Sequence, residues 1–365
     1  MGDLIQTTAD LAASCALAQE AGLLSLDTEF VWRSTYRAQL AIVQLGERKS
    51  CWAIDCLAGL AADALRKLVD DPGVVKILHD SRQDLMHLRH WCGASPKNVF
   101  DTQLAAAFAG FRSGIGLQTL LFEACGVGLP KTETCTDWTQ RPLSDAQVRY
   151  ALDDVRYLPQ LRDELLSRAE ALGTRAWLEE ELKTLDDPAR YVEFDPGEAW
   201  RRIRLGRVRL DGLGRAVLRA VVARREALAE QWNLPRGWLG DDGSLVAMAV
   251  SGSVGKLRHR LKGGRVDTVR ASYAEAIEAA KSLDASEWPD DPHRHYIREV
   301  TEAAGAAMEW LVARAGELHV DQAVLASRST VTAFVDDVGD RSNPLASGWR
   351  YEVVGRELAE RFGVD

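Results

Sequence analysis

The sequence predicts an α/β domain, built from a mixed β-sheet flanked by helices, that is followed by all-helical domains. Segments with the apolar pattern of strands alternate with amphipathic helical segments over the first 175 residues, and such alternation is typical of α/β folds. After the charged segment that ends at Pro188, only helical periodicity remains. At 365 residues, the chain is long enough for two or three domains.

The predicted strands lie near the start of the chain. The N-terminal residues have the periodicity of a surface helix. Four later segments have the apolar pattern of strands: residues 23–30, 38–46, 51–56 and 74–79. The short polar connections between the first three favour an antiparallel meander.

Helical segments follow the last of these strands. An amphipathic helix is expected from about residue 82 to about residue 91. Asp101 comes directly after a short strand pattern and is well placed to cap the next helix. Ser144 and Gln147 have the spacing of a capping box, and they begin a long helix that is expected to run to about residue 172, where Gly173 ends it.

Changes in periodicity divide the chain into four parts. A first domain is expected at residues 1–175, and the charged segment 176–195 is expected to be a linker. Two all-helical domains are expected at residues 196–280 and 285–365, separated by a short stretch with two prolines.

Composition excludes several classes of protein. The apolar fraction of 46% and the charged fraction of 27% are those of a soluble globular protein. No segment approaches 18 consecutive apolar residues, so a membrane span is not expected, and the N-terminus lacks the basic start of a signal peptide. Six cysteines fall within the first 135 residues without a Cys-x-x-Cys pair. Reduced thiols in a cytoplasmic protein are therefore expected.

The net charge of −9 conceals an uneven distribution of charge. Residues 196–270 contain 16 Lys and Arg against 7 Asp and Glu, a net charge of +9, so the remainder of the chain carries −18. A basic region joined to acidic ones is expected where one part of a protein holds a polyanion. A solvated, charged helix surface is the alternative interpretation.

Four acidic residues and a tyrosine form the candidate site. Asp27 and Glu29 are two apart on a predicted strand, so their side chains point to the same face. Asp84 lies where a predicted strand gives way to a helix, and Tyr150 and Asp154 are one helical turn apart. Each feature alone has an ordinary explanation: a solvated strand edge, stabilisation of a helix dipole, or a surface pair on a helix.

These residues stand in four motifs whose order is informative. The motifs are LDTEF, HDSRQDL, FDTQLAA and RPLSDAQVRYALDDVRYL, and they span about residues 22–170. Together they resemble the DEDD exonuclease superfamily and, within it, the ribonuclease D family. The resemblance implies a ribonuclease H-like fold and a 3′→5′ exoribonuclease that releases nucleoside 5′-monophosphates. A related subclass has His five residues before the last Asp; Arg149 stands there in this chain, which indicates the tyrosine subclass.

The resemblance also implies a role for each residue of the site. Two divalent ions, Mg²⁺ or Mn²⁺, would be held by Asp27, Glu29, Asp84 and Asp154, and Tyr150 would orient the attacking water. Carboxylate oxygens suit such hard ions, and two ions about 4 Å apart can stabilise the attacking and leaving oxygens of a displacement at phosphorus. A phenol, with a reference pKa of about 10, is a poor base at pH 7, which favours orientation of the water over its deprotonation.

Other residues near the motifs are weaker candidates. Asp153 competes with Asp154 as a ligand, but the Tyr-x-x-x-Asp spacing favours Asp154. Five residues are candidates for contact with the substrate: Phe30, His79, Lys131, Trp138 and Arg141. A core aromatic ring and a hydrogen-bonded histidine are the alternatives for the first two. Asp101 is interpreted as structural.

The basic region contains further recognisable residues. Trp200, an apolar run that begins at Leu213, and the sequence NLPRGW fall within about residues 196–275, and this segment resembles an HRDC domain, a small helical module of the ribonuclease D family and of RecQ-type helicases. Arginines crowd its first helix and the residues that follow, which suits contact with phosphates: Arg201, Arg202, Arg204, Arg207 and Arg209. The last segment looks like a second HRDC-like domain, with a packing domain as the alternative.

The sequence therefore predicts a 3′→5′ exoribonuclease that acts on RNA in the cytoplasm. The resemblance implies tRNA precursors with 3′ extensions as substrates, and neither a membrane nor an obligatory protein partner is expected. A DNA 3′→5′ exonuclease and a non-catalytic RNA-binding module are the alternatives. No polymerase or helicase motor with a Walker-type phosphate loop follows, which disfavours the first, and all four acids and the tyrosine are present, which disfavours the second.

Overall fold

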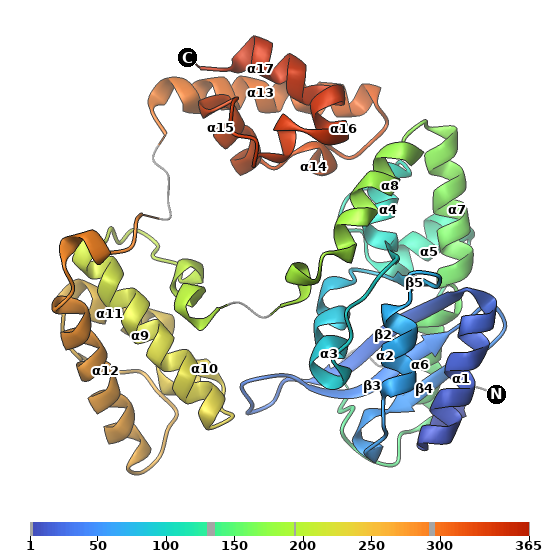
Figure 1. The fold of residues 1–365 in the computed structure, drawn as a ribbon, viewed down its shortest axis with the longest axis horizontal. Helices are drawn as coiled ribbons and strands as arrows, with labels where there is room; N and C mark the ends of the chain where they lie inside the picture. Colours follow the sequence, from blue (N-terminus) through green and yellow to red (C-terminus); the bar gives the residue numbers. More distant parts are fainter. Residues whose placement is uncertain (1–2, 130–135, 193–194, 292–295, 365) are drawn as a thin grey trace. The chain divides into compact units, whose positions relative to one another are not determined.

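The computed structural model describes residues 3–129, 136–192, 195–291 and 296–364. The chain forms two compact units (Figure 1). The first unit comprises Met1–Val31, Leu40–Val192 and Tyr296–Asp365, and the second comprises Trp32–Gln39 and Glu193–His295. The second unit is therefore inserted into the sequence of the first at two places.

A six-stranded mixed sheet forms the centre of the first unit. Its strands are β1 (Asp3–Ile5), β2 (Leu23–Val31), β3 (Gln39–Gly46), β4 (Cys51–Asp55), β5 (Val75–Leu78) and β6 (Val99–Asp101). They lie in the order β1-β4-β3-β2-β5-β6. Strands β3 and β4 are antiparallel, whereas β4 pairs in parallel with β1, and β5 pairs in parallel with β2 and β6. The predicted α/β class with a mixed sheet is confirmed.

Helices flank this sheet. Those up to residue 183 are α1 (Thr8–Ala21), α2 (Asp63–Asp70), α3 (Arg82–Cys92), α4 (Thr102–Phe108), α5 (Leu117–Cys125), α6 (Asp145–Arg156), α7 (Leu158–Ala171) and α8 (Arg175–Lys183). Asp101 caps α4, because its carboxylate accepts the N–H groups of Gln103 and Leu104. Ser144 and Gln147 form the predicted capping box at the start of α6.

Two expectations about these elements were wrong. The single helix expected from Ser144 to about residue 172 is two helices, α6 and α7, separated at Tyr157. Pro159, the second residue of α7, has no N–H to donate to the carbonyl of Val155, so the α-helical pattern cannot continue without a break. The N-terminal segment is not helical from its start, since Asp3–Ile5 form β1, which pairs with β4.

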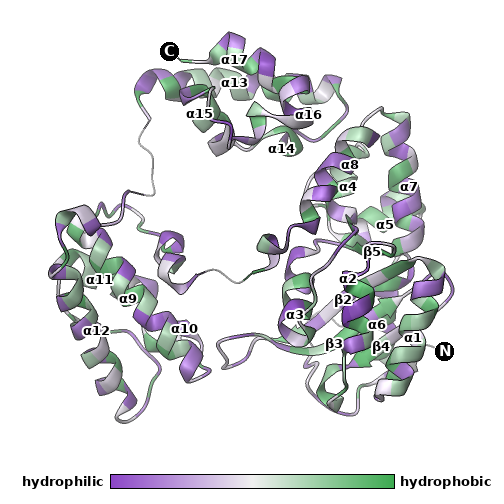
Figure 2. Ribbon diagram, viewed as in Figure 1, coloured by the Kyte–Doolittle hydropathy of each residue, from purple (hydrophilic) through white to green (hydrophobic). Residues whose placement is uncertain are grey.

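Alternation along β2 assigns its side chains to two faces of the sheet. Leu24 and Leu26 pack with α1, α2 and α3 in one apolar cluster. Leu23 belongs to another cluster, which includes residues of α4, α5 and α7. Asp27 and Glu29 are an even number of residues from each other and from Leu23, so they share its face of the sheet. Figure 2 shows the mixture of hydrophobic and hydrophilic residues along the helices that such one-sided packing requires.

The C-terminal helices complete the first unit. Trp349 lies against the rings of Phe108 and Trp177, with ring centroids 5.5 and 5.6 Å away. Arg350 forms an ion pair of 2.5 Å with Glu181 of α8. A separate domain at residues 285–365 stays a prediction, but these helices share an apolar core with α4 and α8. They are α13 (Arg298–Glu317), α14 (Gln322–Leu325), α15 (Arg328–Asp336), α16 (Gly348–Arg350) and α17 (Arg356–Phe362).

The second unit contains no strand among its described residues. Its α-helices are α9 (Gly212–Gln231), α10 (Arg236–Leu239), α11 (Asp242–Ser251) and α12 (Arg265–Lys281). Trp200 and Tyr273 are buried in its core. The arginines expected on the first helix and after it lie as follows: a 3₁₀ helix, η4 (Pro196–Arg202), contains Arg201 and Arg202, and residues 203–211, which carry the other three, form no regular helix.

The described residues bear on two expectations, the one about membrane spans and the one about the cysteines. None of the helices described is both long and apolar enough to cross a membrane. The five described cysteines are free thiols: Cys15, Cys51, Cys56, Cys92 and Cys125. The sixth, Cys135, lies outside the described residues.

Candidate active site

Four of the predicted site residues line one cavity in the first unit. Asp27 and Glu29 extend into it from β2, and Tyr150 and Asp154 extend into it from α6. The cavity has a volume of about 540 Å³. Because α6 packs on the face of β2 that carries the two acids, residues more than 120 positions apart in sequence meet at one surface.

Asp84 joins this group from the first turn of α3. Its side chain is 8% exposed, and its Oδ1 accepts a hydrogen bond of 2.5 Å from the hydroxyl of Thr28, which lies on β2 between Asp27 and Glu29. Burial, followed by the charge of Asp27, raises the pKa of Asp84 well above its usual value. The structure thus brings all four predicted acids into electrostatic contact.

Burial and mutual repulsion raise the pKa values of the clustered carboxyl groups. Burial raises the pKa of Asp27 to about 6, and a hydrogen bond from the backbone of Thr28 opposes this shift. Burial raises the pKa of Glu29 to about 9, with added repulsion from Asp27, Asp154 and Asp84. Burial and the charge of Asp27 raise the pKa of Asp154 to about 8. In the absence of a cation, these groups resist full ionisation at neutral pH.

The donor chemistry of the cluster fits hard divalent ions. Every candidate ligand is a carboxylate, and oxygen donors of this kind suit Mg²⁺ or Mn²⁺. Within the described ranges, no three His, Cys, Asp or Glu side chains form a closed set of metal ligands. The fit rests on charge: partly desolvated carboxylates that repel one another are stabilised in their ionised form by a bound cation.

Tyr150 is positioned by its aromatic neighbour and by the acids. Its ring lies against Trp138, with a centroid distance of 6.1 Å and an interplanar angle of 38°. Burial raises the pKa of Tyr150 above its usual value, and the charges of Asp154 and Glu29 raise it further. The phenol therefore stays protonated at neutral pH and can donate or accept a hydrogen bond.

Asp153, the competing candidate for the last ligand, has a different neighbour. Its carboxylate forms an ion pair of 3.1 Å with Arg156, one turn along α6. Asp154, not Asp153, lines the cavity. The observed orientation of α6 supports the choice of Asp154 from the motif spacing.

His79 and Phe30 have well-defined structural contacts. His79 lines the cavity, but both of its ring nitrogens are engaged, with Thr102 Oγ1 at 2.9 Å and the carbonyl oxygen of Ile115 at 3.0 Å. Phe30 contacts the ring of His87, with a centroid distance of 4.3 Å. A substrate contact by either side chain stays a prediction.

The remaining candidates lie in or near the loop before α6. Trp138 is 3% exposed and packs in a core with strands β3 and β4. Arg141 donates two hydrogen bonds to Asp55, of 2.8 and 2.6 Å, and one of 2.7 Å to the carbonyl of Trp138. Lys131 lies outside the described residues. Neither Trp138 nor Arg141 lines the cavity, so their roles in substrate binding stay predictions.

Sequence analysis missed one side of the cavity. This side is formed by residues at the start of α5: Gly116, Leu117, Gln118 and Thr119. A glycine followed by leucine and two polar residues at a helix start is a common pattern, so the sequence gave only a weak indication of this part of the site. Their approach to the acids depends on how α5 packs against α7, which local patterns do not determine.

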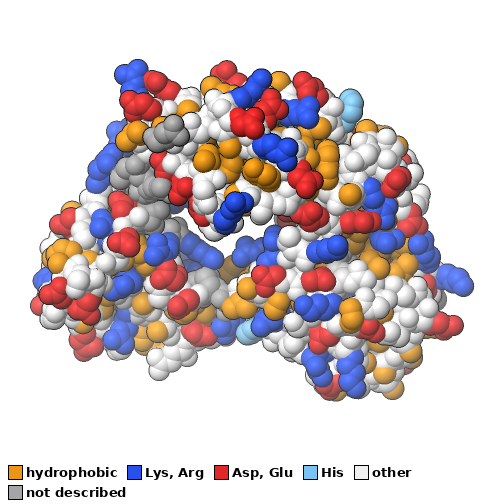
Figure 3. Space-filling view, turned by 45° about the horizontal axis from the view of Figure 1, so that its top comes forward, with side chains coloured by type: hydrophobic (Ala, Val, Ile, Leu, Met, Phe, Trp, Pro, Cys, Tyr) orange, Lys and Arg blue, Asp and Glu red, His pale blue; other side chains and the backbone are white. Residues whose placement is uncertain are grey.

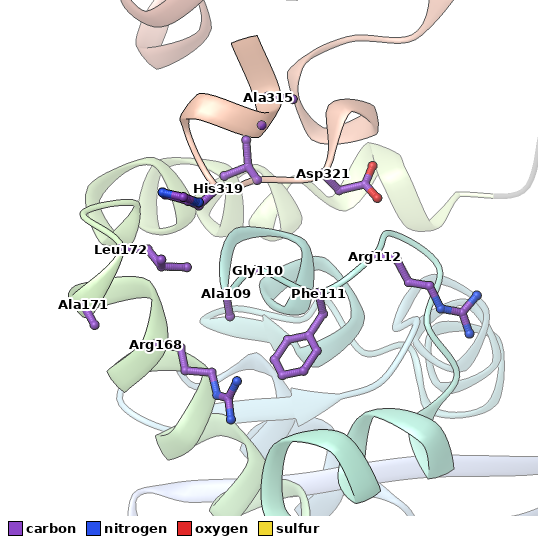
Figure 4. A pocket seen from close by; sticks show the side chains of 12 residues that line it. Ala109, Gly110, Phe111, Arg112, Arg168, Ala171, Leu172, Ala315, His319 and Asp321 are labelled. Atoms are coloured by element: carbon purple, nitrogen blue, oxygen red, sulfur yellow. The ribbon is translucent and has the colours of Figure 1, made fainter. Parts of the chain in front are cut away.

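A second cavity of about 590 Å³ lies elsewhere in the first unit (Figure 4). Its lining is basic and apolar, and its charged side chains are largely engaged. Arg168 donates a hydrogen bond of 2.7 Å to Glu164, and its guanidinium lies over the ring of Phe111. Asp321 accepts the N–H of Ser113 at 2.9 Å. Of these two cavities, the acidic one is lined by three carboxyl side chains, whose oxygens suit divalent ions.

Known proteins resemble this chain in both sequence and fold. A 3′-5′ exonuclease family model matches residues 3–170. Ribonuclease D of Zymomonas mobilis is 33% identical over 97% of this chain and 92% of its own length. Ribonuclease D of Granulibacter bethesdensis is 34% identical over 97% and 91%. Among solved structures, that of Escherichia coli RNase D superimposes over the full length of both chains with a TM-score of 0.85 and 26% identity.

A structure with lower sequence identity also has a similar fold. The catalytic core of RRP6 from Trypanosoma brucei has a TM-score of 0.61 at 21% identity, and the match covers 78% of this chain and 81% of that one. The expectation of a phosphodiester hydrolase with 3′→5′ exoribonuclease activity is confirmed by the family model and the relatives. The chain belongs to the ribonuclease D family.

Proposed function

We propose that this chain trims the 3′ ends of RNA by two-metal-ion hydrolysis and releases nucleoside 5′-monophosphates. Asp27, Glu29, Asp84 and Asp154 would hold the ions, and tRNA precursors with 3′ extensions would be the substrates. One observation carries the proposal: four carboxylates from β2, α3 and α6 interact electrostatically around a cavity that also contains a tyrosine.

The carboxylates have two tasks in this reaction. Their oxygens would bind the ions, and their shared face would direct both ions to the same phosphate. Two divalent ions, when bound, supply charge that stabilises the attacking and leaving oxygens of an in-line displacement. The engaged hydroxyl of Thr28 would hold Asp84 in the orientation that binding requires.

Tyr150 would orient the attacking water. Its raised pKa makes the phenol a poor base, because burial and neighbouring carboxylates disfavour the phenolate. A protonated phenol can still hold a water molecule by a hydrogen bond, and the packing of its ring against Trp138 restricts where that bond points. The proton of the attacking water would be transferred to bulk solvent or to the departing oxygen.

The second unit would hold the body of the RNA. The side chains of Arg204, Arg207 and Arg209 are exposed on an irregular segment, where they can reach phosphates without competing with helix packing. Figure 3 shows Lys and Arg side chains among acidic ones on the face in view. The proposed HRDC-type module at residues 196–280 and HRDC-like module at 285–365 would serve binding and packing, while the cavity acids perform hydrolysis.

One experiment tests the activity and its metal dependence together. RNA and DNA of equal sequence, labelled at the 3′ or the 5′ end, are incubated with the full-length protein in Mg²⁺, Mn²⁺ or EDTA. The 3′ label should leave first as a mononucleotide, and the 5′-labelled RNA should shorten one nucleotide at a time only with a divalent ion. Internal fragments, equal activity in EDTA, or faster hydrolysis of DNA would contradict the proposal.

A further inference from the structure

Phe122, on α5, is the most exposed of the large hydrophobic side chains that the structure describes. Its exposed fraction is 66%, and among the described residues no aromatic ring or guanidinium group packs on it. Leu120 and Leu121 bury another side of α5 in an apolar cluster to which Phe122 does not belong. A single exposed apolar side chain is ordinary, so a role for Phe122 depends on what lies beside it.

The first turn of α5 connects Phe122 to the acidic cavity of the same unit. Gln118 and Thr119 line that cavity, and Phe122 follows them by four and three residues. Residues three and four apart on a helix are neighbours on its surface, with Cβ atoms about 5–6 Å apart. The ring of Phe122 therefore lies one helical turn beyond the wall of the cavity.

The start of α5 differs in charge from the other walls of the cavity. Strand β2 contributes Asp27 and Glu29, and α6 contributes Asp154, whereas the lining residues of α5 and the glycine before them carry no charge. The first charged residue of α5, Glu123, points about 100° around the helix from Phe122. Because RNA is a polyanion, the nucleotides that precede the 3′ end meet the least repulsion along α5.

The end of α5 borders a third cavity of the first unit, of about 680 Å³. Cys125, three residues after Phe122 and seven after Gln118, lines it together with Arg48 and Arg156. The two carboxylates in its lining are paired with arginines: Asp163 with Arg48 at 2.8 Å, and Glu164 with Arg168 at 2.7 Å. Arg48 and Arg156 are half exposed, and a guanidinium in a surface ion pair keeps N–H groups that can donate to a phosphate. One face of α5 thus leads from the acidic cavity, over Phe122, to two guanidinium groups.

We propose that Phe122 is a stacking platform for the base that precedes the 3′-terminal nucleotide of the RNA, and that the strand continues along α5 towards Arg48 and Arg156. The inference rests on the proposed function, since it assumes that a 3′ end occupies the acidic cavity. Stacking on an aromatic ring tolerates any base, which suits an enzyme that moves each nucleotide past the same ring. A protein partner is disfavoured, because one ring among polar residues offers little apolar area.

The test uses the full-length protein and a six-nucleotide single-stranded RNA in which an abasic ribose replaces each nucleotide in turn. The initial release of the 3′-terminal nucleotide gives kcat and KM. Phe122→Ala should lower kcat/KM for the intact RNA about tenfold, the size expected for one stacked base, mainly by raising KM. Loss of the base before the terminal nucleotide should cost the wild type about as much. It should cost Phe122→Ala nothing further, because both changes remove the same interaction.

Three variants serve as controls. Phe122→Tyr keeps an aromatic ring and should behave as the wild type, whereas Phe122→Leu keeps an apolar side chain without a ring and should resemble Phe122→Ala. Leu17 is 49% exposed on α1, which packs with Leu24 and Leu26 on the face of the sheet opposite Asp27. Leu17→Ala should leave kcat and KM unchanged. Melting temperatures of all four variants should match that of the wild type, since neither side chain is buried.

The outcomes separate this inference from the proposed function. Additive losses from Phe122→Ala and the abasic ribose at that position, or an equal effect of Leu17→Ala, would overturn the stacking platform. A native mass that falls with Phe122→Ala would assign the ring to a contact between two copies of the chain instead. If the wild type hydrolyses no RNA, the proposed function fails, and fluorescence anisotropy of the 5′-labelled intact and abasic RNAs in EDTA, with wild type and Phe122→Ala, still decides whether Phe122 binds this base.

Discussion

The hydroxyl of Thr28 donates a 2.5 Å hydrogen bond to Asp84 across 56 residues of sequence. Both side chains are buried, at 6% and 8% exposure. Thr28 lies between two proposed metal ligands on β2, so this single bond ties the strand that carries Asp27 and Glu29 to the helix that carries Asp84. It therefore links the two elements that carry three of the four acids.

Thr28→Val should lower turnover while leaving the strand intact. Valine keeps the β-branched shape of threonine but cannot donate, and a hydrogen bond to a charged group contributes about 1.5–3 kcal/mol. We expect turnover to fall about tenfold or more and the affinity for Mn²⁺ to weaken. Thr28→Ser, which retains the hydroxyl, is the control. Equal turnover of the valine and serine variants would show that the bond does not position Asp84.

Asp84→Asn should abolish most turnover without unfolding the protein. The substitution keeps the shape of the side chain and removes one ligand charge from the cluster. It also relieves repulsion with Asp27, so thermal stability in EDTA should not fall. Hydrolysis of a short RNA and the melting temperature are measured side by side. Activity like that of the wild type, at equal protein and metal concentrations, would remove Asp84 from the site.

Tyr150→Phe keeps the ring against Trp138 and removes the hydroxyl. If Tyr150 orients the attacking water, turnover at saturating metal and RNA should fall roughly 10²-fold or more, with little change in Mn²⁺ affinity. Calorimetric titration of Mn²⁺ beside steady-state kinetics checks both parts. Weaker metal binding with unchanged saturated turnover would instead indicate a structural role.

The pair Asp153 and Asp154 offers a matched comparison on α6. Asp154→Asn should remove most turnover, because Asp154 lines the cavity, whereas Asp153→Asn should be mild, because Asp153 pairs with Arg156. The two variants change the same group at neighbouring positions. Similar decreases in turnover for both would mean that the ligand has been assigned to the wrong residue.

Lys76 should make stability depend on pH in the alkaline range. It is fully buried in β5, where its ammonium donates to the carbonyls of Asp71 and Val74, and burial lowers its pKa to about 8 despite the charges of Asp71, Asp186 and Asp70. The unfolded chain binds this proton up to a pKa of about 10.5 and the folded chain releases it earlier, so the contribution of Lys76 to stability rises with pH between these values, by about 3 kcal/mol at most.

The control for this prediction is Lys76→Met, compared with the wild type by urea unfolding at intervals from pH 7 to pH 10.5. Methionine does not titrate, so the difference in unfolding free energy between the two proteins should change in favour of the wild type as the pH rises. A constant difference over this range would show that Lys76 has an ordinary pKa in the folded protein.

The basic segment of the second unit should control the salt dependence of RNA binding. A truncation after residue 195 would also remove Trp349, which packs on Phe108 and Trp177, so full-length variants are the better test. Replacing Arg204, Arg207 and Arg209 with Ala should lower the slope of log Kd against log salt by roughly one unit for each phosphate that an arginine no longer binds. Hydrolysis of a dinucleotide at saturation should not change.

A second triple variant controls for net charge in that experiment. Arg175, Arg298 and Arg361 each pair with a glutamate one turn away on a helix of the first unit. Their replacement with Ala changes the charge of the protein equally. Equal salt slopes for the two triple variants on a folded RNA would show that residues 203–211 are a solvated surface without a specific role.

The sequence predicted those parts of the site that are encoded by short spacings. Asp27 and Glu29 share a face because strands alternate, and Tyr150 and Asp154 share a face because helices turn in 3.6 residues. The sequence could not predict the bond from Thr28 to Asp84 or the approach of Gln118 to the cavity. Each of these depends on packing between distant elements, which local patterns do not specify.

The errors in secondary structure have similar causes. Strand β1 was missed because three residues show too little periodicity, and pairing with β4 decides their conformation. The break between α6 and α7 could have been found, since Pro159 stands inside the expected helix.

The packing of Trp349 on Phe108 and Trp177 also has a consequence for synthesis on the ribosome. More than 170 residues separate Trp349 from either partner, and the larger part of the second unit, Glu193–His295, is translated between them. A nascent chain that already contains every proposed metal ligand therefore still exposes apolar surface on α4 and α8. That surface is covered only when the last helices emerge, so ribosomes that stop early would release chains prone to aggregation.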